Sequence, residues 1–144
     1  MSDQAIVWGD DGSKLILDCI YEVYKNLGPG LLELVYERAL MQELTERGLK
    51  ARNQVPVRAF YKGYDLGIDY RLDILVEDKI VIELKSVEQL QPVHEKQLLT
   101  YLKLADKQLG FLVNFNESYL KRGIKRVVNG FKEPLVDMLN KNDN

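Results

Sequence analysis

The spacing of apolar residues predicts two helices in the first third of the chain. Apolar side chains recur every three or four positions over residues 13–27 and again over residues 31–47, which is the spacing of one helical face. Ser13 suits an N-cap, Gly28-Pro29-Gly30 ends the first helix, and Gly48 ends the second. The buried stripe expected in the first helix is Leu15, Ile16, Cys19, Ile20, Val23, Tyr24 and Leu27; in the second it is Leu31, Leu34, Val35, Ala39 and Leu44, with Glu33, Tyr36, Glu37 and Leu40 on an adjacent face.

Residues 54–85 have the runs of Val, Ile, Leu and Tyr that are typical of β-strands. Two short polar turns separate three such runs, which predicts a three-stranded meander. Pro56 indicates that the first strand lies at an edge or begins irregularly, and Gly67 suggests a bulge in the second. The strands are expected over residues 54–61, 64–76 and 79–85, with Lys62-Gly63 and Glu77-Asp78 in the turns.

A helix and two further strands are expected in the second half. Pro92 suits the start of a helix over about residues 93–105, and the apolar run 109–115 indicates a strand. Because a helix separates this strand from the meander, we expect it to run parallel to one strand of the meander. Residues 124–128 predict a short edge strand and residues 131–139 a last short helix. One side of the helix after Pro92 carries Val93, Gln97, Thr100, Tyr101 and Leu104, and Leu98 and Leu102 widen its apolar surface.

Together these elements predict an α/β fold (an α+β mixed sheet) in which helices flank a central sheet. We expect a single domain over residues 1–144, because no linker, repeat or low-complexity segment divides the chain and its length suffices for a core. Residues 1–12 are expected to form an arm with Trp8 as its large apolar anchor, and residues 141–144 a frayed tail.

Composition narrows the classes of protein that fit. The chain is 46% apolar and 29% charged, as expected for a soluble globular protein, and no apolar run approaches the roughly 20 residues of a membrane span. The first residues lack the layout of a secretory signal, so we expect a cytoplasmic protein. Cys19 is the single cysteine, which excludes an internal disulfide; on its apolar stripe it is expected in the core rather than as a nucleophile. His94, the single histidine, is expected at the surface or in a helix cap, so a structural zinc site within one chain is excluded.

The net charge of −2 hides an uneven distribution. Residues 1–95 hold 17 Asp and Glu against 11 Lys and Arg, whereas residues 96–132 hold 8 Lys and Arg against 2 acids. An acidic half and a basic half suit a metal site beside a phosphate-binding surface. They suit a solvated surface or a head-to-tail contact between proteins equally well.

Two acids and a lysine stand on the otherwise apolar second and third strands. A carboxylate on an apolar strand is costly unless it is paired or binds a cation, so Asp73 and Glu83 suit a hard divalent ion such as Mg²⁺. Lys85, on the same strand face as Glu83, could then orient or activate a water beside the metal. The alternative is an exposed sheet face whose Glu–Lys pair contributes less than about 1 kcal/mol. Alternation places Leu72, Ile74 and Val76 together on the face opposite Asp73 and Arg71.

The helices carry further polar residues in positions that suit a site. Glu33 lies in the first turn of its helix, where the helix dipole favours an acid, and that location is also a complete structural explanation. Gln97 and Tyr101 are four residues apart, one helical turn, and can act on the same ligand.

Several short motifs accompany these elements. They are Gly30-Leu31-Leu32-Glu33-Leu34-Val35-Tyr36, Tyr70-Arg71-Leu72-Asp73-Ile74-Leu75-Val76, Ile82-Glu83-Leu84-Lys85-Ser86-Val87, Gln97-Leu98-Leu99-Thr100-Tyr101-Leu102-Lys103, Asn114-Phe115-Asn116 and Gly123-Ile124-Lys125-Arg126. Their order on a helix, a three-strand meander, a helix and a strand resembles the PD-(D/E)xK nuclease superfamily, and most closely its branch of GxxExxY proteins. The resemblance covers roughly residues 13–130.

The resemblance implies a role for each candidate residue. Asp73 and Glu83 would bind Mg²⁺ or Mn²⁺, with the Leu84 carbonyl as a further ligand. Glu33 would complete or orient the metal shell. Lys85 would position or help deprotonate the attacking water and stabilise charge at the phosphate. Residues that would support the site or contact nucleic acid are Tyr36, Gln97 and Tyr101.

The sequence therefore predicts a metal-dependent nuclease that hydrolyses phosphodiester bonds of DNA or RNA with water activated by Mg²⁺. The alternatives are a non-catalytic module that binds nucleic acid or protein on the same fold, and an oligomeric scaffold whose acids are structural. Specificity could depend on a homodimer or on another protein. Four cations are expected either to hold neighbouring phosphates or to form a solvated face: Lys121, Arg122, Lys125 and Arg126.

Overall fold

The computed structural model describes residues 11–130 of the 144-residue chain. The expected arm over residues 1–12 therefore lies outside the described residues except for its last two, and so does Trp8. The short helix predicted over residues 131–139 and the tail over 141–144 also lie outside them.

The first helix forms as predicted, with a different start. Helix α2 covers Ser13–Leu27, and the expected stripe supplies its buried residues. Ser13 is not the N-cap: Gly12 holds that position, and Ser13 is the first helical residue. The Ser13 N–H donates to Oδ1 of Asp11 at 3.0 Å, so an acid two residues earlier satisfies it. The buried residues of α2 are Ile16, Cys19, Ile20 and Val23.

The second helix buries a different face from the one that apolar spacing predicted. Helix α3 covers Glu33–Glu46, and Leu31, Leu34 and Val35 on or before it are exposed. Tyr36 takes the core position because its ring stacks on Phe115, with ring centroids 4.4 Å apart and planes within 5°. The side chains that α3 buries are Tyr36, Glu37, Leu40 and Leu44, so only Leu44 of the predicted core stripe is fully buried.

The strands form one five-stranded mixed sheet in the order β1-β2-β3-β4-β5. The predicted meander is confirmed, because β2 pairs antiparallel with both β1 and β3. The strand after the α4 helix runs parallel to β3, also as predicted, and β1, which contains Pro56, lies at an edge. The elements are β1 Ala51–Tyr61, β2 Tyr64–Val76, β3 Ile80–Lys85, α4 Pro92–Ala105, β4 Leu109–Asn114, η1 Leu120–Gly123 and β5 Ile124–Val128.

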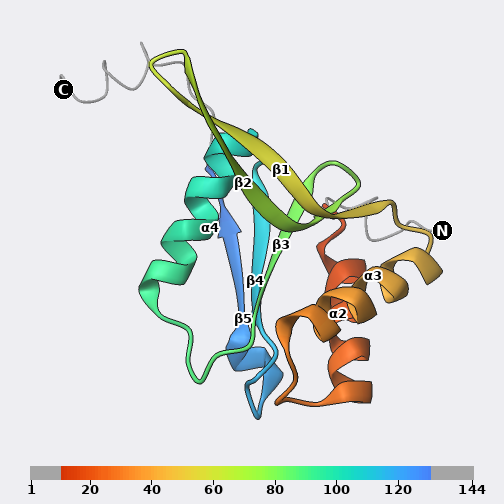
Figure 1. Ribbon diagram of the computed structural model, residues 1–144. Helices are drawn as coiled ribbons and strands as arrows, with labels where there is room; N and C mark the ends of the chain where they lie inside the picture. The colour runs from red at the N-terminus through yellow and green to blue at the C-terminus, as the bar shows by residue number, and fades with distance from the viewer. Residues whose placement is uncertain (1–10, 131–144) are drawn as a thin grey trace, which may run out of the picture.

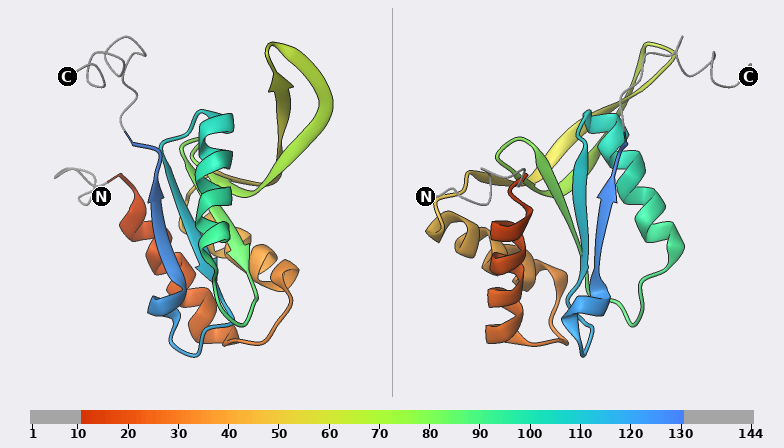
Figure 2. Two further views of the ribbon diagram at one scale, coloured as in Figure 1. Left: turned by 90° about the vertical axis from the view of Figure 1, so that its left-hand side faces the viewer. Right: turned by 180° about the vertical axis from the view of Figure 1, so that it is seen from behind.

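The helices form layers on the two faces of the sheet, with α2 and α3 on one side and α4 on the other (Figures 1 and 2). Each layer closes its own apolar cluster, one centred on Ile20, Leu40 and Phe111 and the other on Leu98 and Leu112. The α4 face was predicted wrongly in part. Its fully buried residues are Leu98 and Leu102, whereas Val93 and Leu104 are exposed.

The β1–β2 hairpin changes the face that it buries at Gln54. Ile74 packs in the cluster beside α2 and α3, whereas Leu72 packs in the cluster beside α4. Their partners on β1, Asn53 and Val55, change sides in the same way. Gln54 lies between these partners with a φ of 53°, and this left-handed residue breaks the alternation of side chains. The prediction that Leu72 shares a face with Ile74 was therefore wrong.

Smaller predictions about the fold are also decided. The bulge expected at Gly67 is confirmed: the β1–β2 register shifts between Arg58 and Phe60, opposite Gly67, which has a φ of 72°. His94 is a cap residue as expected, since its Nδ1 accepts a hydrogen bond from the Gln91 N–H at 2.9 Å. Among residues 11–130, no helix is long and apolar enough to cross a membrane.

Candidate active site

Asp73 and Glu83 meet where strands β2 and β3 separate. The last regular pair between these strands is Ile74 with Ile82. Beyond it, the carboxylates replace the backbone ladder: the Asp73 N–H donates to Oε1 of Glu83 at 3.0 Å, and the Leu84 N–H donates to Oδ2 of Asp73 at 2.8 Å. Each acid thus uses one oxygen to hold the neighbouring strand. Two carboxylates are therefore fixed side by side at the point where β2 and β3 separate.

This acid pair carries more negative charge than its surroundings balance. Glu83 is buried and Asp73 is partly buried. Burial and, after it, the charge of Asp73 raise the pKa of Glu83 to about 8, although the hydrogen bond from the Asp73 N–H and the charge of Lys85 act to lower it. Burial also raises the pKa of Asp73, as do the charges of Glu37 and Glu33. A pair of this kind is stabilised by protons or by a cation.

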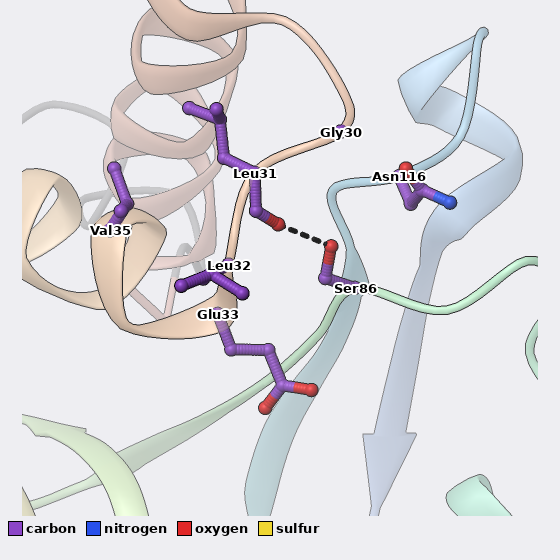
Figure 3. Close-up of a pocket in the computed structure, with 7 residues that line it drawn as sticks. All are labelled: Gly30, Leu31, Leu32, Glu33, Val35, Ser86 and Asn116. Carbon is purple, nitrogen blue, oxygen red and sulfur yellow. Dashed lines mark hydrogen bonds between the residues drawn. The ribbon is translucent and has the colours of Figure 1, made fainter.

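Glu33 is the first residue of α3, and its charge contributes to the raised pKa of Asp73, but its carboxylate makes no hydrogen bond to the acid pair within the described residues. The Ser86 hydroxyl donates to the Leu31 carbonyl at 2.6 Å, which ties the loop before α3 to the residue that follows Lys85. Figure 3 shows the Glu33 carboxylate pointing away from this hydrogen bond. A cavity of about 750 Å³ beside this hydrogen bond is lined by Gly30, Leu31, Leu32, Glu33, Val35, Ser86 and Asn116.

Tyr36 organises the same loop from inside the core. Its hydroxyl donates to the Gly28 carbonyl and accepts from the Leu31 N–H at 3.1 Å. The ring is completely buried, so Tyr36 supports the start of α3 and does not present its side chain to a ligand.

Glu37 is a buried acid beside the site that sequence reasoning did not select. Its side chain is 5% exposed, and its oxygens accept hydrogen bonds from Nδ2 of Asn53 at 2.9 Å and Nε2 of Gln54 at 2.7 Å. Its charge contributes to the raised pKa of Asp73, which lies across from Gln54 on β2. The Glu37 position next to Tyr36 was visible in the sequence, but the amides that hold it come from a strand 16 residues away.

Lys85 is held at the end of β3 by Asn114, its partner on β4. The fully buried Asn114 side chain binds the Val87 backbone in both directions: the Val87 N–H donates to Oδ1 at 3.0 Å and Nδ2 donates to the Val87 carbonyl at 2.9 Å. Gly123 packs against the same residue, and a Cβ there would lie 2.6 Å from the Asn114 carbonyl oxygen. The Asn114 and Gly123 motifs thus shape the strand end that carries Lys85.

Tyr101 approaches the acids from α4, on the other side of the sheet. Burial raises its pKa, and the charges of Glu83, Tyr70 and Asp73 raise it further. Its ring lies 5.4 Å from that of Tyr70. Gln97, one turn earlier on α4, is exposed, and no hydrogen bond joins it to the acids among the described residues.

The four predicted cations do not gather on one surface. Arg126 pairs with Phe111, and its guanidinium forms an ion pair with Asp11 at 2.9 Å beside the start of α2. Lys125 pairs with Leu112, which pairs with Glu83, so alternation places Lys125 on the face of Glu83. Lys121 and Arg122 lie in η1, where Arg122 sits over the Tyr119 ring at 5.5 Å.

A comparison with protein-family models decides the family. Residues 10–127 match the model described as the PD-(D/E)XK nuclease superfamily. The chain belongs to this superfamily. Searches of curated protein sequences and of solved structures gave no significant match.

Membership in the PD-(D/E)XK superfamily suggests nuclease activity and implies a nucleic acid substrate. Nucleases of this superfamily generally depend on divalent metals. The residues at the acid pair fit such an ion, because they supply anionic oxygen donors in a place where negative charge is in excess. Across residues 11–130, no three or more His, Cys, Asp or Glu side chains form a group that could hold a metal by themselves.

Proposed function

We propose that this PD-(D/E)XK chain is a metal-dependent nuclease of the GxxExxY branch that hydrolyses phosphodiester bonds of DNA or RNA. The observation that carries the proposal is the reciprocal pair of Asp73, which is partly buried, and Glu83, which is buried, at the point where β2 and β3 separate. One oxygen of each carboxylate accepts a backbone N–H, and we propose the other oxygens as ligands of a cation. A divalent ion such as Mg²⁺ or Mn²⁺ would relieve the excess negative charge and supply activated water when bound.

The other proposed roles follow from position around this pair. The Leu84 carbonyl is a further oxygen ligand, and Glu33 completes or orients the metal shell from α3. Lys85, whose charge lowers the pKa of Glu83, holds the attacking water and stabilises the phosphate. Tyr36 supports the loop before Glu33 through its buried hydroxyl. The residues proposed to contact nucleic acid are Gln97, Tyr101, Lys121, Arg122 and Lys125, and we further propose a cytoplasmic location.

Cleavage assays with purified protein test this function. Labelled single-stranded, duplex and branched DNA and RNA are incubated with Mg²⁺ or Mn²⁺, and with EDTA as the metal-free control. We expect Glu83→Gln and Lys85→Ala each to lower the rate by at least about 100-fold. Glu88→Gln and Lys79→Ala provide matched controls, because these side chains are exposed and of the same charge types.

Two outcomes would contradict the proposal. If wild type and Glu83→Gln cleave alike, the activity comes from a contaminant or another site. If no substrate is cleaved but labelled nucleic acid binds, the protein is a non-catalytic module that binds nucleic acid. Calorimetric titration with Mn²⁺ distinguishes the scaffold alternative, which requires that the ion does not bind at millimolar concentration.

A further inference from the structure

The outer part of the β1–β2 hairpin forms an arm that leaves the sheet. Strand β2 pairs with β3 only over residues 74–76, so residues 57–70 of the hairpin, here called the arm, pair only with each other. Figures 1 and 2 show this part of the hairpin standing clear of the other strands. An isolated two-stranded hairpin is only marginally stable in water, so an arm of this length benefits from a partner surface.

The two faces of the arm differ in chemistry. Val57 packs in the cluster beside α4 and pairs with Tyr70, and Tyr61 pairs with Tyr64, so alternation along β1 places all four on one face. Ile68, two residues from Tyr70, shares that face. The exposed members, which we call the apolar face of the arm, are Tyr61 (59% exposed), Tyr64 (73%), Ile68 (62%) and Tyr70 (37%).

The opposite face is polar and already paired. Nε of Arg58 lies 2.7 Å from Oδ1 of Asp65, and Nη1 of Arg58 lies 3.4 Å from Oδ1 of Asp69. Phe60, which pairs with Asp65, is the large apolar residue on this side. Arg58 is therefore satisfied by two acids and is turned away from the apolar face.

The charge of the arm argues against nucleic acid as the occupant of the apolar face. The arm has two cations, Arg58 and Lys62, and two acids, Asp65 and Asp69, so its net charge is zero. Arg58 is ion-paired on the other face, and Nζ of Lys62 lies over the Tyr61 ring at 5.4 Å. Binding to a phosphate backbone needs several cations to neutralise it, and this face offers one.

We propose that the apolar face of the arm is the surface through which two copies of this chain associate. The same face of aromatic and aliphatic side chains on both copies, with Lys62 as its one charged residue, suits a two-fold, isologous contact. The four exposed side chains of this face offer roughly 500 Å² on each copy, or about 1,000 Å² together, the lower limit for a specific interface. The contact that we propose is face to face, because the exposed apolar side chains project from the face of the arm and not along its backbone edges.

The test compares substitutions on opposite faces of one arm. Sedimentation velocity is measured from nanomolar to high micromolar full-length protein in EDTA, without nucleic acid, so the outcome does not depend on the proposed nuclease function. We expect wild type to dimerise and Ile68→Lys to weaken dimerisation by at least about 30-fold. Phe60→Lys, with a side chain equally exposed on the other face (58%), should dimerise as wild type does.

Circular dichroism of each variant checks that it folds, and Tyr64→Lys at the tip replaces Ile68→Lys if the latter does not. The proposal is overturned if wild type stays monomeric at all concentrations, or if Phe60→Lys weakens the dimer as much as Ile68→Lys. It is also overturned if wild type is monomeric and Ile68→Lys instead loses affinity for a labelled oligothymidylate. That result would assign the face to single-stranded nucleic acid.

Discussion

Gln54 donates a hydrogen bond from its side-chain amide to Oε1 of Glu37 at 2.7 Å, while its neighbour Asn53 donates to the other oxygen of the same carboxylate. Successive residues of a regular strand point to opposite faces, so one of the two must leave the regular conformation. Gln54 does so, with a φ of 53°. This clamp joins α3 to β1 across from Asp73, at the point where the hairpin changes the face that it buries.

The clamp predicts that Glu37→Gln destabilises the protein. A glutamine can accept only one of the two amide hydrogen bonds and turns an N–H₂ toward the other donor. We expect the free energy of unfolding to fall by about 1–3 kcal/mol, measured by urea denaturation. Glu46→Gln, at the exposed end of the same helix, is the matched control and should change it by less than about 0.5 kcal/mol. Equal effects of the two substitutions would mean that the clamp contributes nothing.

The raised pKa of Glu83 predicts an unusual dependence of stability on pH. Between its ordinary value of 4.5 and about 8, the folded state keeps a proton that the unfolded state has released. The folded state binds more protons in this window, so the Glu83 contribution to stability falls as pH rises through it. Glu83→Gln cannot ionise and still accepts from the Asp73 N–H. In EDTA, its advantage over wild type should grow toward pH 8, to on the order of a few kcal/mol. Parallel stability curves for the two proteins from about pH 5 to about pH 8 would refute this.

A bound divalent ion should offset the loss of stability that Glu83 causes as pH rises toward 8. At a pH near 8, Mn²⁺ is expected to raise the melting temperature of wild type, because binding only to the folded state stabilises it. Asp73→Asn removes one carboxylate and should lose most of the shift, whereas the exposed Asp78→Asn should retain it. Differential scanning fluorimetry with and without EDTA measures both. If Mn²⁺ raises the melting temperatures of Asp73→Asn and Asp78→Asn equally, the ion binds at another site.

The loop before α3 depends on the Tyr36 hydroxyl. Tyr36→Phe keeps the stacking on Phe115 but removes the hydrogen bonds to Gly28 and Leu31. We expect a loss of about 1–2 kcal/mol in the free energy of unfolding and, because Glu33 begins the helix there, a lower cleavage rate. Tyr21→Phe, a partly exposed tyrosine of α2, is the control for both measurements. If the cleavage rate of Tyr36→Phe equals that of wild type, the position of Glu33 does not affect the reaction.

Cys19 should resist thiol reagents in the native protein. It is fully buried on α2 in the cluster that α2 and α3 form with the sheet, and burial raises its pKa to about 11. Because the thiolate is the reactive form, we expect labelling by a thiol reagent near pH 8 only as fast as the protein unfolds. Complete reaction in urea is the positive control. Rapid labelling without denaturant would show that this part of the core opens.

The two halves of the site were predictable to different degrees. Asp73, Glu83 and Lys85 could be selected because charged residues on apolar strands violate the local pattern, whatever the rest of the chain does. Glu37 could not be selected in this way. In the sequence, Glu37 is an ordinary polar residue of a helix. Only the folded chain brings Asn53 and Gln54 of β1 close enough to donate hydrogen bonds to it.

The same division holds for the faces of the helices. Apolar spacing located α2, α3 and α4, and it identified the stripe of α2 that includes Ile20 and Val23. For α3, apolar spacing assigned Leu31, Leu34 and Val35 to the core. In the structure these residues are exposed, and the face of α3 that is buried is the one with Tyr36, which stacks on Phe115. Long-range contacts of this kind have no local signal in the spacing.

Within residues 11–130, the sequence by itself determined the α-helices and β-strands, their order and the acid pair with its lysine, because hydrophobic period and turn residues act over a few positions. Only the tertiary structure decided which helix faces are buried and where β1 and β2 change the face that they bury. It also decided that Arg126 forms an ion pair with Asp11, whereas Lys125 lies on the sheet face of Glu83. Those outcomes depend on partners brought together from distant parts of the chain. Gln54 is the clearest case, since its left-handed conformation has a reason only once Glu37 stands beside it.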